Sequence, residues 1–263
     1  MHLIISNLLK KLRSTQPLVH NITNHVVMNS TANALLAIGA SPVMAHAHEE
    51  VAEMVALSGS LVVNTGTLTS QTLASMVGAA KAANTINKPW VLDPVGVGAT
   101  PFRLSSNQQL LQLKPSVVKG NASEMTALFN GELGGKGVDS DSGSESTLRF
   151  LQAKAREHNL TIVVTGELDF IADGERLAKI SNGDAMMARV TGMGCTATAL
   201  IGAFLAVTDC YWEASVAAIA CLGIAGELAA KNSVGPGSFQ FQLLDQLYQL
   251  DHHRIDRYLA IDV

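Results

Sequence analysis

Short runs rich in Val, Ile and Leu alternate along this chain with longer segments whose apolar residues recur at helical spacing. The short runs occupy residues 61–64, 89–93, 116–119 and 161–165. Runs of this length and composition are typical of parallel strands that are buried on both faces of a sheet. Between them, segments such as 70–83 and 145–158 place apolar residues on one helix face and polar residues opposite. The alternation predicts an α/β fold with a mostly parallel central sheet.

The C-terminal half departs from this alternation. Residues 168–172 and 177–180 flank Asp-Gly-Glu at 173–175, which is a hairpin signature, so we expect one antiparallel hairpin and a mixed sheet. From residue 194 onward the chain is Ala-rich and helical, with a Gly-Pro-Gly sequence before the last helix. The predicted helices of this part are 194–207, 212–231 and 240–252.

The sequence contains no linker that would divide it into two domains. Its 263 residues, of which 48% are hydrophobic, are enough for one α/β core, so we expect residues 1–263 to form a single domain. The glycine-rich segment 131–144 is predicted to be a surface loop, which could serve as a simple connection or as a lid.

Charge and cysteine content narrow the function classes. The net charge of −4, without any run of Lys and Arg, argues against a nucleic-acid-binding surface and favours small-molecule chemistry. The 3 cysteines form no Cys-x-x-Cys pair, so a reducing cytoplasm is expected. The N-terminus resembles an amphipathic helix rather than a signal peptide. The apolar segment 214–226 is too short to span a membrane and ends at Glu227, so it is predicted to be a buried helix.

A glycine-rich turn leads directly into the apolar helix predicted at 197–206. Glycine lets the backbone approach a ligand closely, and the free N–H groups of a helix start attract anions. The predicted phosphate-binding anion hole comprises Gly192, Met193, Gly194 and Cys195. Close packing of small residues is the alternative explanation. The same residues match a relaxed dinucleotide fingerprint, but no strong strand precedes them and no acidic residue stands at the expected distance, so we reject a dinucleotide fold.

Cys195 would lie in the first turn of this helix. The helix dipole is expected to lower the pKa of a thiol there, so Cys195 could act as a base or nucleophile. An inert, buried cysteine is the alternative, because no His-Asn or His-Asp pattern indicates a cysteine hydrolase. Cys210 and Cys221 lie within or beside apolar helices and are predicted to be packing residues.

Two carboxylates follow predicted strands. Asp93 precedes a Pro-Val-Gly-Val-Gly loop and suits Mg²⁺, directly or through water, although an ordinary turn aspartate would look the same. Glu124 occupies the capping-box position of a helix whose predicted N-cap is Asn121. Because parallel strands end at the same edge of a sheet, these acids, Lys119 and the glycine turn should come together. Phosphoryl transfer requires such a combination.

Other nucleotide and metal signatures are missing from the sequence. There is no Gly-x-x-x-x-Gly-Lys-Ser/Thr motif, so a P-loop fold is not expected. The 8 histidines include no His-Glu-x-x-His, and His46 and His48 are predicted to be polar surface residues at the start of a helical segment. Zinc chemistry is therefore not expected.

A series of short motifs is spread over almost the whole chain. They are PLVHNITN at 17–24, GASPVM at 39–44, NTGTL at 64–68, LDPVGVGA at 92–99, GNASE at 120–124, VTGE at 164–167 and GMGC at 192–195. In their order and spacing these motifs resemble the hydroxyethylthiazole kinase family of the ribokinase-like superfamily. The resemblance implies a three-layer sandwich and ATP-dependent phosphorylation of the primary alcohol of 4-methyl-5-(2-hydroxyethyl)thiazole, for thiamine salvage. It also implies Mg²⁺ as cofactor and a homotrimer with active sites between subunits.

The resemblance carries over to individual residues. The implied thiazole contacts are Met44 and Gly192, with Asn24 and Val26 nearby. The implied ATP contacts are Lys119, Thr165 and Asn121. Asp93 and Glu124 would organise magnesium and phosphates, and Cys195 stands where related sugar kinases carry an aspartate base. Cys195 is therefore the candidate proton acceptor or positioner of the alcohol.

Two residues depart from the family pattern. Lys119 replaces the usual Arg and supplies a point charge instead of a two-pronged donor. Met193 replaces the usual Thr between the glycines and supplies no hydroxyl. The open alternatives are a same-fold kinase of another small heterocyclic alcohol, a silent thiazole- or nucleotide-binding protein, and a cysteine hydrolase.

Overall fold

The computed structural model describes residues 1–133 and 145–263. The glycine-rich loop expected at 131–144 therefore lies almost wholly outside the described residues. The helices are α1 (His2–Thr15), α2 (Met28–Ile38), α3 (Val51–Leu57), α4 (Ser70–Thr85), α5 (Pro101–Leu111), α6 (Ala122–Asn130), α7 (Glu145–His158), α8 (Met193–Leu205), α9 (Tyr211–Lys231), α10 (Pro236–Gln249) and α11 (His252–Tyr258), with a 3-10 helix at Ala185–Arg189. The strands are β1 (Leu18–Ile22), β2 (Ser41–Val43), β3 (Ser60–Asn64), β4 (Trp90–Asp93), β5 (Val117–Gly120), β6 (Thr161–Val164), β7 (Asp169–Ala172), β8 (Leu177–Ile180) and β9 (Ile261–Asp262).

Within the described residues the strands form one 9-stranded sheet, in the order β2-β1-β3-β4-β5-β6-β7-β8-β9. Strands β1 to β6 pair in parallel, whereas β7, β8 and β9 pair antiparallel with their neighbours. The predicted α/β fold with a mostly parallel sheet and one antiparallel hairpin is confirmed. Gly174 closes the hairpin turn between β7 and β8 with a φ of 91°.

Three strands were not predicted from the sequence: β1, β2 and β9, the last of which has only two residues. Strand β1 contains the polar residues His20 and Asn21, which are fully buried, so its sequence lacks the apolar run of its neighbours. Strand β2 has only three residues, one of which is Pro42. Proline donates no hydrogen bond, and this strand lies at the sheet edge, where that loss is tolerated.

The last helices also differ from their predicted bounds. Helix α10 begins at Pro236, before the predicted residue 240, because proline suits the first helical position, where its missing N–H is not needed. A separate helix, α11, follows it. The Asp251 side chain caps α11 by accepting a hydrogen bond from Arg254 N at 2.9 Å.

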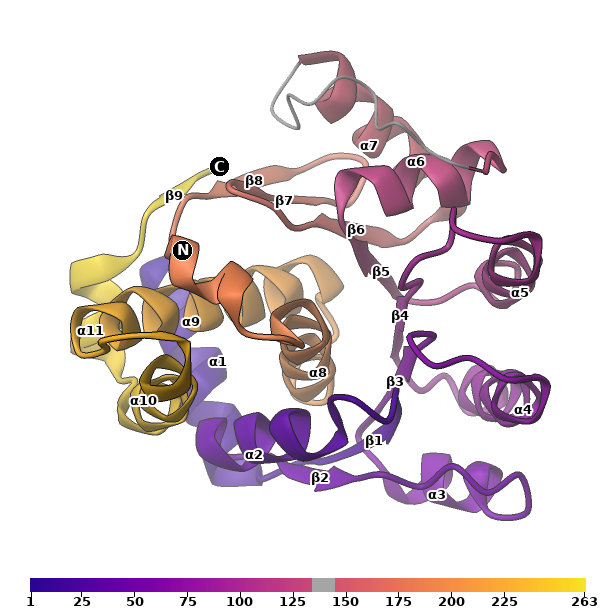
Figure 1. The fold of residues 1–263 in the computed structure, drawn as a ribbon, viewed down its shortest axis with the longest axis horizontal. Helices are drawn as coiled ribbons and strands as arrows, with labels where there is room; N and C mark the ends of the chain where they lie inside the picture. Colours follow the sequence, from indigo (N-terminus) through magenta and orange to yellow (C-terminus); the bar gives the residue numbers. More distant parts are fainter. Residues whose placement is uncertain (134–144) are drawn as a thin grey trace.

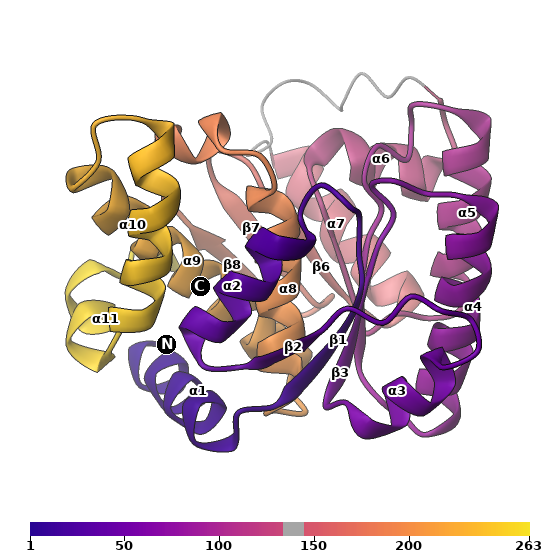
Figure 2. The same cartoon turned by 60° about the horizontal axis from the view of Figure 1, so that its bottom comes forward.

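The sheet separates two helical layers, as Figures 1 and 2 show. Alternate residues of each strand point to opposite faces. Val62 and Val91 pack with α8 and α9, in the larger core, whereas Val63 and Leu92 pack with α4 and α6 on the other side. Helices α1, α2, α10 and α11 complete the first layer, and α3, α5 and α7 complete the second. The three-layer sandwich expected from the resemblance is confirmed.

Among the described helices, only α9 is long and apolar enough to cross a membrane by length and composition. In the fold, 83% of its apolar window is buried inside the protein. It packs between α8 and α10, which is the environment of a core helix.

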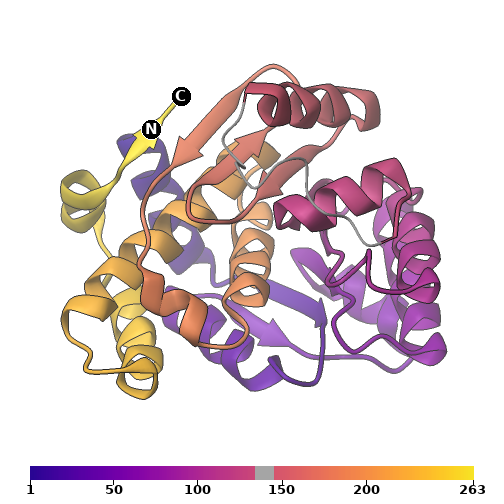
Figure 3. The same cartoon turned by 45° about the horizontal axis from the view of Figure 1, so that its top comes forward.

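One arginine ties both ends of the chain to the first layer. Arg13, in the last turn of α1, donates from Nε to Ile38 O at 3.2 Å, from Nη1 to Leu250 O at 2.6 Å and from Nη2 to Leu247 O at 2.9 Å. These carbonyls end α2 and α10, where the helix dipole favours a cation. Helix α1 also packs against α11, and the two termini lie on the same side of the molecule (Figure 3).

Candidate active site

A cavity of about 420 Å³ opens at the carboxyl ends of the parallel strands, between the starts of α6 and α8. Ligands bind at this edge in open α/β sheets. Its lining residues are Asn24, Val26, Val27, Gly66, Thr67, Asp93, Val95, Lys119, Asn121, Glu124, Thr165, Thr191, Gly192, Gly194 and Cys195. The structure thus brings together every site residue predicted from the sequence except Met44 and Met193.

The two exceptions have different causes. Met193 packs its side chain against the core, so only its backbone can face the cavity. Met44 lies just beyond the edge strand β2 and is half-buried outside the lining of this cavity.

The start of α8 forms one wall of the cavity. Gly192 is its N-cap with a left-handed φ of 86°, and no side chain caps the helix. A Cβ on Gly192 would lie 2.6 Å from Val27 Cγ1, and a Cβ on Gly194 would lie 2.9 Å from Lys119 Nζ. The ammonium group of Lys119 therefore sits directly at the positive end of the helix. Both charges favour an anion at this point.

Asp93 lies opposite this helix start and is 1% exposed. Its Oδ2 accepts hydrogen bonds from Asn64 Nδ2 at 2.7 Å and from Thr198 Oγ1 at 2.6 Å. Its Oδ1 is 3.9 Å from Lys119 Nζ. Burial raises the pKa of Asp93, while Lys119 and the two donors oppose that rise.

Glu124 joins two loops at the cavity. Its Oε2 accepts from Asn121 N at 2.9 Å, which completes the predicted capping box at the start of α6. Its Oε1 accepts from Gly96 N at 2.8 Å, in the loop after β4. The capping interpretation is confirmed, and each carboxylate oxygen keeps a lone pair for a ligand.

The pKa of the Cys195 thiol differs from the prediction. Asn24 Nδ2 lies 3.4 Å from Sγ and donates to it. Burial, followed by the charge of Asp93, raises the pKa of the Cys195 thiol, so the predicted lowering by the helix dipole is wrong. Desolvation of the thiolate outweighs the helix terminus here, and the thiol stays protonated at neutral pH.

Several residues at the site were not found from the sequence. Asn64 and Thr198 hold Asp93 from below the cavity. Arg103, on α5, donates to the carbonyls of Thr65, Val95 and Gly66 at 2.8, 2.8 and 2.6 Å, which joins the loops after β3 and β4. Only Asn64 had a local signal, since it ends an apolar strand.

Asp169 is a further acidic residue near Lys119 that the sequence did not single out. It begins β7 and its Oδ1 accepts from Gly166 N at 3.0 Å. Burial raises the pKa of Asp169 to about 6, against the opposing influence of Gly166 N–H and Lys119.

The donor set fits Mg²⁺ held through water. Among the described residues, no group of three or more His, Cys, Asp or Glu side chains is arranged to hold a metal ion directly. Mg²⁺ usually keeps several waters and is bound by one or two carboxylates together with substrate phosphates. Asp93 and Glu124 supply that kind of partial shell next to the anion-binding helix start.

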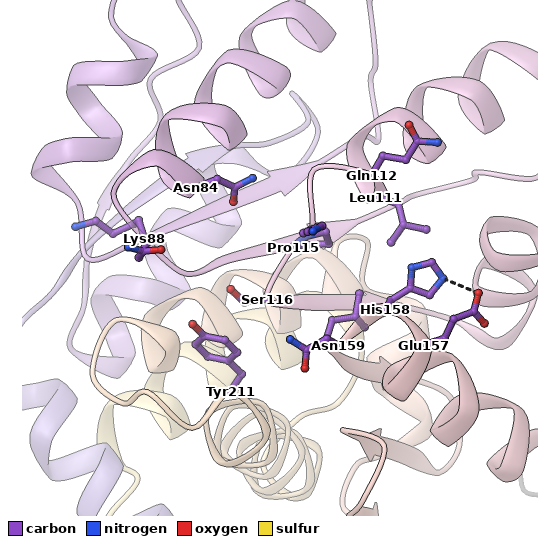
Figure 4. Close-up of a pocket in the computed structure, with 13 residues that line it drawn as sticks. Asn84, Lys88, Leu111, Gln112, Pro115, Ser116, Glu157, His158, Asn159 and Tyr211 are labelled. Atoms are coloured by element: carbon purple, nitrogen blue, oxygen red, sulfur yellow. Dashed lines mark ion pairs between the residues drawn. The ribbon is translucent and has the colours of Figure 1, made fainter.

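A larger cavity, of about 670 Å³, lies at the opposite edge of the sheet (Figure 4). It is formed by the loops that precede β4, β5 and β6. Its polar groups already serve the fold: Lys88 Nζ donates to Ser58 O, Asn84 accepts from the Trp90 indole, and Glu157 pairs with His158. The smaller cavity, with its acids, lysine and helix start, is therefore the candidate active site.

The family model and the relatives in sequence agree on one family. The model of the hydroxyethylthiazole kinase family matches residues 9–253. A protein from Desulfotalea psychrophila named hydroxyethylthiazole kinase is 47% identical over 250 residues, covering 95% of this chain and 92% of its own. A protein of the same name from Leptospira biflexa is 49% identical over 252 residues, covering 95% of this chain and 94% of its own.

Solved structures agree. The hydroxyethylthiazole kinase protein from Pyrococcus horikoshii superposes with a TM-score of 0.92 at 45% identity, over 98% of both chains. A pyridoxal kinase from Staphylococcus aureus shares the fold with a TM-score of 0.60 at 16% identity, over 80% of this chain and 88% of its own. The chain belongs to the hydroxyethylthiazole kinase family.

Proposed function

We propose that this protein transfers the γ-phosphoryl group of ATP to the primary alcohol of hydroxyethylthiazole, as a step of thiamine salvage. The observation that carries the proposal is the meeting of Lys119, the uncapped start of α8 and the Asp93 carboxylate in one cavity. In a chain of this family, that arrangement matches a transferred phosphoryl group and its charge.

Lys119 and the first turn of α8 stabilise the transferred group. The ammonium and the free N–H groups converge on one point, so they can balance the charge on the phosphoryl oxygens without rearranging. We assign ATP contacts to Lys119, Thr165 and Asn121, which line the same side of the cavity.

Asp93 and Glu124 would hold Mg²⁺ through its water ligands. When bound, the ion neutralises phosphate charge and orients the nucleotide. The protein side of this site is rigid, because Asp93 accepts two side-chain hydrogen bonds and Glu124 accepts two backbone hydrogen bonds.

Cys195 orients the alcohol rather than removing its proton. Its raised pKa makes the thiolate a minor species at neutral pH. Phosphoryl transfer through a loose transition state needs little early proton removal, so a neutral group that places the hydroxyl suffices. Gly192, Asn24 and Val26 contact the thiazole beside it, at the mouth of the cavity.

We further propose that the active protein is a homotrimer in the cytoplasm, with Met44 reaching the cavity of a neighbouring copy. Met44 follows the edge strand β2 and does not line the cavity of its own chain. Val26, at the cavity mouth, is 65% exposed and offers an apolar surface for such a contact.

The test is ADP release from MgATP by purified protein, with and without hydroxyethylthiazole, and product mass by mass spectrometry. Thiazole-dependent release of ADP, with a product heavier by one phosphoryl group, is expected. Binding of the thiazole without turnover would replace the proposal by a silent binding protein. Turnover with only another heterocyclic alcohol would change the substrate, and ester cleavage blocked by thiol alkylation would indicate a hydrolase.

A further inference from the structure

A buried hydrogen-bond chain runs beneath the cavity from Asp93 to Cys195. Asn64 is the last residue of β3 and pairs in register with Asp93, the last residue of β4. Neighbours in register project to the same face of a sheet, which here is the face covered by α8. Asn64 is 1% exposed and Asn24, which completes the chain, is 5% exposed.

The orientation of the Asn64 amide is determined by its partners. Gly66 N donates to Asn64 Oδ1 at 3.1 Å, and a backbone N–H can only donate. Asn64 Nδ2 therefore faces Asp93 Oδ2, at 2.7 Å, which can only accept when ionised. The remaining capacity of Oδ1 is used by Asn24 Nδ2, at 2.8 Å.

The Asn24 amide is oriented in the same way. Val26 N donates to Asn24 Oδ1 at 3.1 Å, so Asn24 Nδ2 points to Asn64 Oδ1 and to Cys195 Sγ. A Cβ on Gly66 would lie only 2.7 Å from Asn24 Nδ2, so the loop after β3 packs tightly against this amide. Since the sulfur receives an N–H from Asn24, the S–H bond of Cys195 points elsewhere.

The two ends of this hydrogen-bond chain, Asp93 and Cys195, depend on Asn64 to different degrees. Asp93 Oδ2 also accepts from Thr198 Oγ1 at 2.6 Å, so its carboxylate stays held without Asn64. The Nδ2 group of Asn24, in contrast, has Asn64 Oδ1 as its short, buried acceptor. Removing Asn64 frees the Asn24 amide and, with it, the group that orients the sulfur.

We propose that Asn64 is a positioning residue for the phosphoryl acceptor: anchored on Asp93 and Gly66, it holds the Asn24 amide that fixes the Cys195 sulfur against the alcohol. This inference rests on the proposed function. A buried polar side chain is costly unless its hydrogen bonds are made, and Asn64 makes all of its bonds to elements of this site.

The test is a double-mutant cycle of Asn64→Leu with Cys195→Ala, with hydroxyethylthiazole and MgATP as substrates. In the wild-type background we expect Asn64→Leu to lower kcat/KM for the thiazole by about thirtyfold, while KM for MgATP changes by less than about threefold. In the Cys195→Ala background the same substitution should lower kcat/KM by less than about threefold, because its target is already gone.

Asn107→Leu is the matched control. Asn107 is also a fully buried amide near this edge, but it bonds to Thr65 Oγ1 and Arg103 O instead of Asn24. We expect it to lower the unfolding temperature while its effect on kcat/KM is the same in both Cys195 backgrounds. If Asn64→Leu does not fold, Asn64→Ala takes its place in the cycle with the same expectation.

Equal losses from Asn64→Leu in the two backgrounds, or no loss at all, would overturn the inference while leaving the kinase in place. Failure of the wild-type protein to phosphorylate the thiazole would overturn the proposed function, and this inference with it.

Discussion

Lys119 is the residue on which the charge balance of the cavity depends most. Its ammonium lies at the head of α8 and 3.9 Å from Asp93 Oδ1. Without it, the anion site loses one of its two positive charges and Asp93 loses its countercharge. We expect Lys119→Ala to lower kcat/KM by about 100-fold or more. Lys119→Arg, which restores the charge, should recover most of the activity.

Cys195 provides the contrasting variant. Cys195→Asp keeps a group that can hydrogen-bond the alcohol, and the helix start and Lys119 partly offset the burial and the Asp93 charge that disfavour a carboxylate there. We therefore expect measurable activity within about tenfold of the wild type. Steady-state kinetics of both variants at saturating MgATP check this ranking. Abolition of turnover to the same extent by Cys195→Asp and Lys119→Ala would contradict it.

Asp169 makes stability depend on pH. Its pKa is raised to about 6 in the folded protein, against 3.8 ordinarily, so the folded state binds the proton more tightly than the unfolded state. Its favourable contribution is therefore present at about pH 4 and is lost as pH rises through about 6. Asp169→Asn removes this dependence and keeps an acceptor for Gly166 N.

Thermal unfolding of wild type and Asp169→Asn between about pH 4 and pH 8 checks this expectation. The variant should gain stability relative to wild type as pH rises, and the difference should level off above about pH 7. Unfolding temperatures that run parallel over the whole range would show that Asp169 does not titrate in this way.

The individual site residues differ in how well the sequence predicted them. The motifs at strand ends pointed to Asp93 and Lys119, and the glycine turn at a helix start pointed to Gly194, because each signal is local. The pKa of Cys195 was mispredicted because burial and Asp93 depend on distant parts of the chain. Arg103 could not be found, since its three carbonyl partners come from loops that only the folded sheet brings together.

At the scale of elements, the first turn of α8 depends on Gly192. Its φ of 86° disfavours any side chain, and a Cβ there would collide with Val27 at the start of α2. We expect Gly192→Ala to cost about 1–3 kcal/mol of unfolding free energy and to reduce turnover strongly, because the N–H groups of the turn must shift. Urea unfolding and kinetics measure both effects.

Gly237→Ala is the control for this prediction. Gly237 lies in the first turn of α10, and a Cβ there would meet nothing within 4 Å. Alanine favours helix over glycine by about 1 kcal/mol, so this variant should be as stable as wild type or more so, with unchanged kinetics. Equal destabilisation by the two substitutions would refute the role given to Gly192.

Elements with a strong internal pattern were predictable and elements defined by their neighbours were not. The hairpin of β7 and β8 follows from its turn sequence, and β3 to β6 follow from their apolar runs. Strand β1 was missed because His20 and Asn21 are buried polar residues whose environment comes from the assembled sheet. The early start of α10 at Pro236 was visible in principle, since proline marks first turns.

At the scale of the whole molecule, the proposed trimer predicts complementation between inactive chains. Lys119→Ala damages the cavity of its own chain, whereas Met44→Arg would damage a neighbour's. Co-expression of the two variants should restore about a quarter of wild-type activity, because a cyclic trimer then contains sites with both native residues. Activity of the co-purified mixture, compared with each variant alone, measures this.

Co-expression of the single variants Lys119→Ala and Asp93→Ala is the control. Both residues line the cavity of one chain, so no site in a mixed trimer can be intact. No recovery is expected from that pair. If Lys119→Ala and Met44→Arg also fail to complement each other, Met44 does not act between subunits.

The hydrogen bonds from Arg13 to the ends of α2 and α10 have a consequence for folding during synthesis. Strands β3 to β6 are neighbours in the sheet in the order in which they are synthesised, so that part can assemble as the chain emerges. Arg13, however, bonds to a carbonyl 237 residues further along. Helix α1 also packs against α8, α9 and α11, so its apolar face stays uncovered until these later helices have been synthesised.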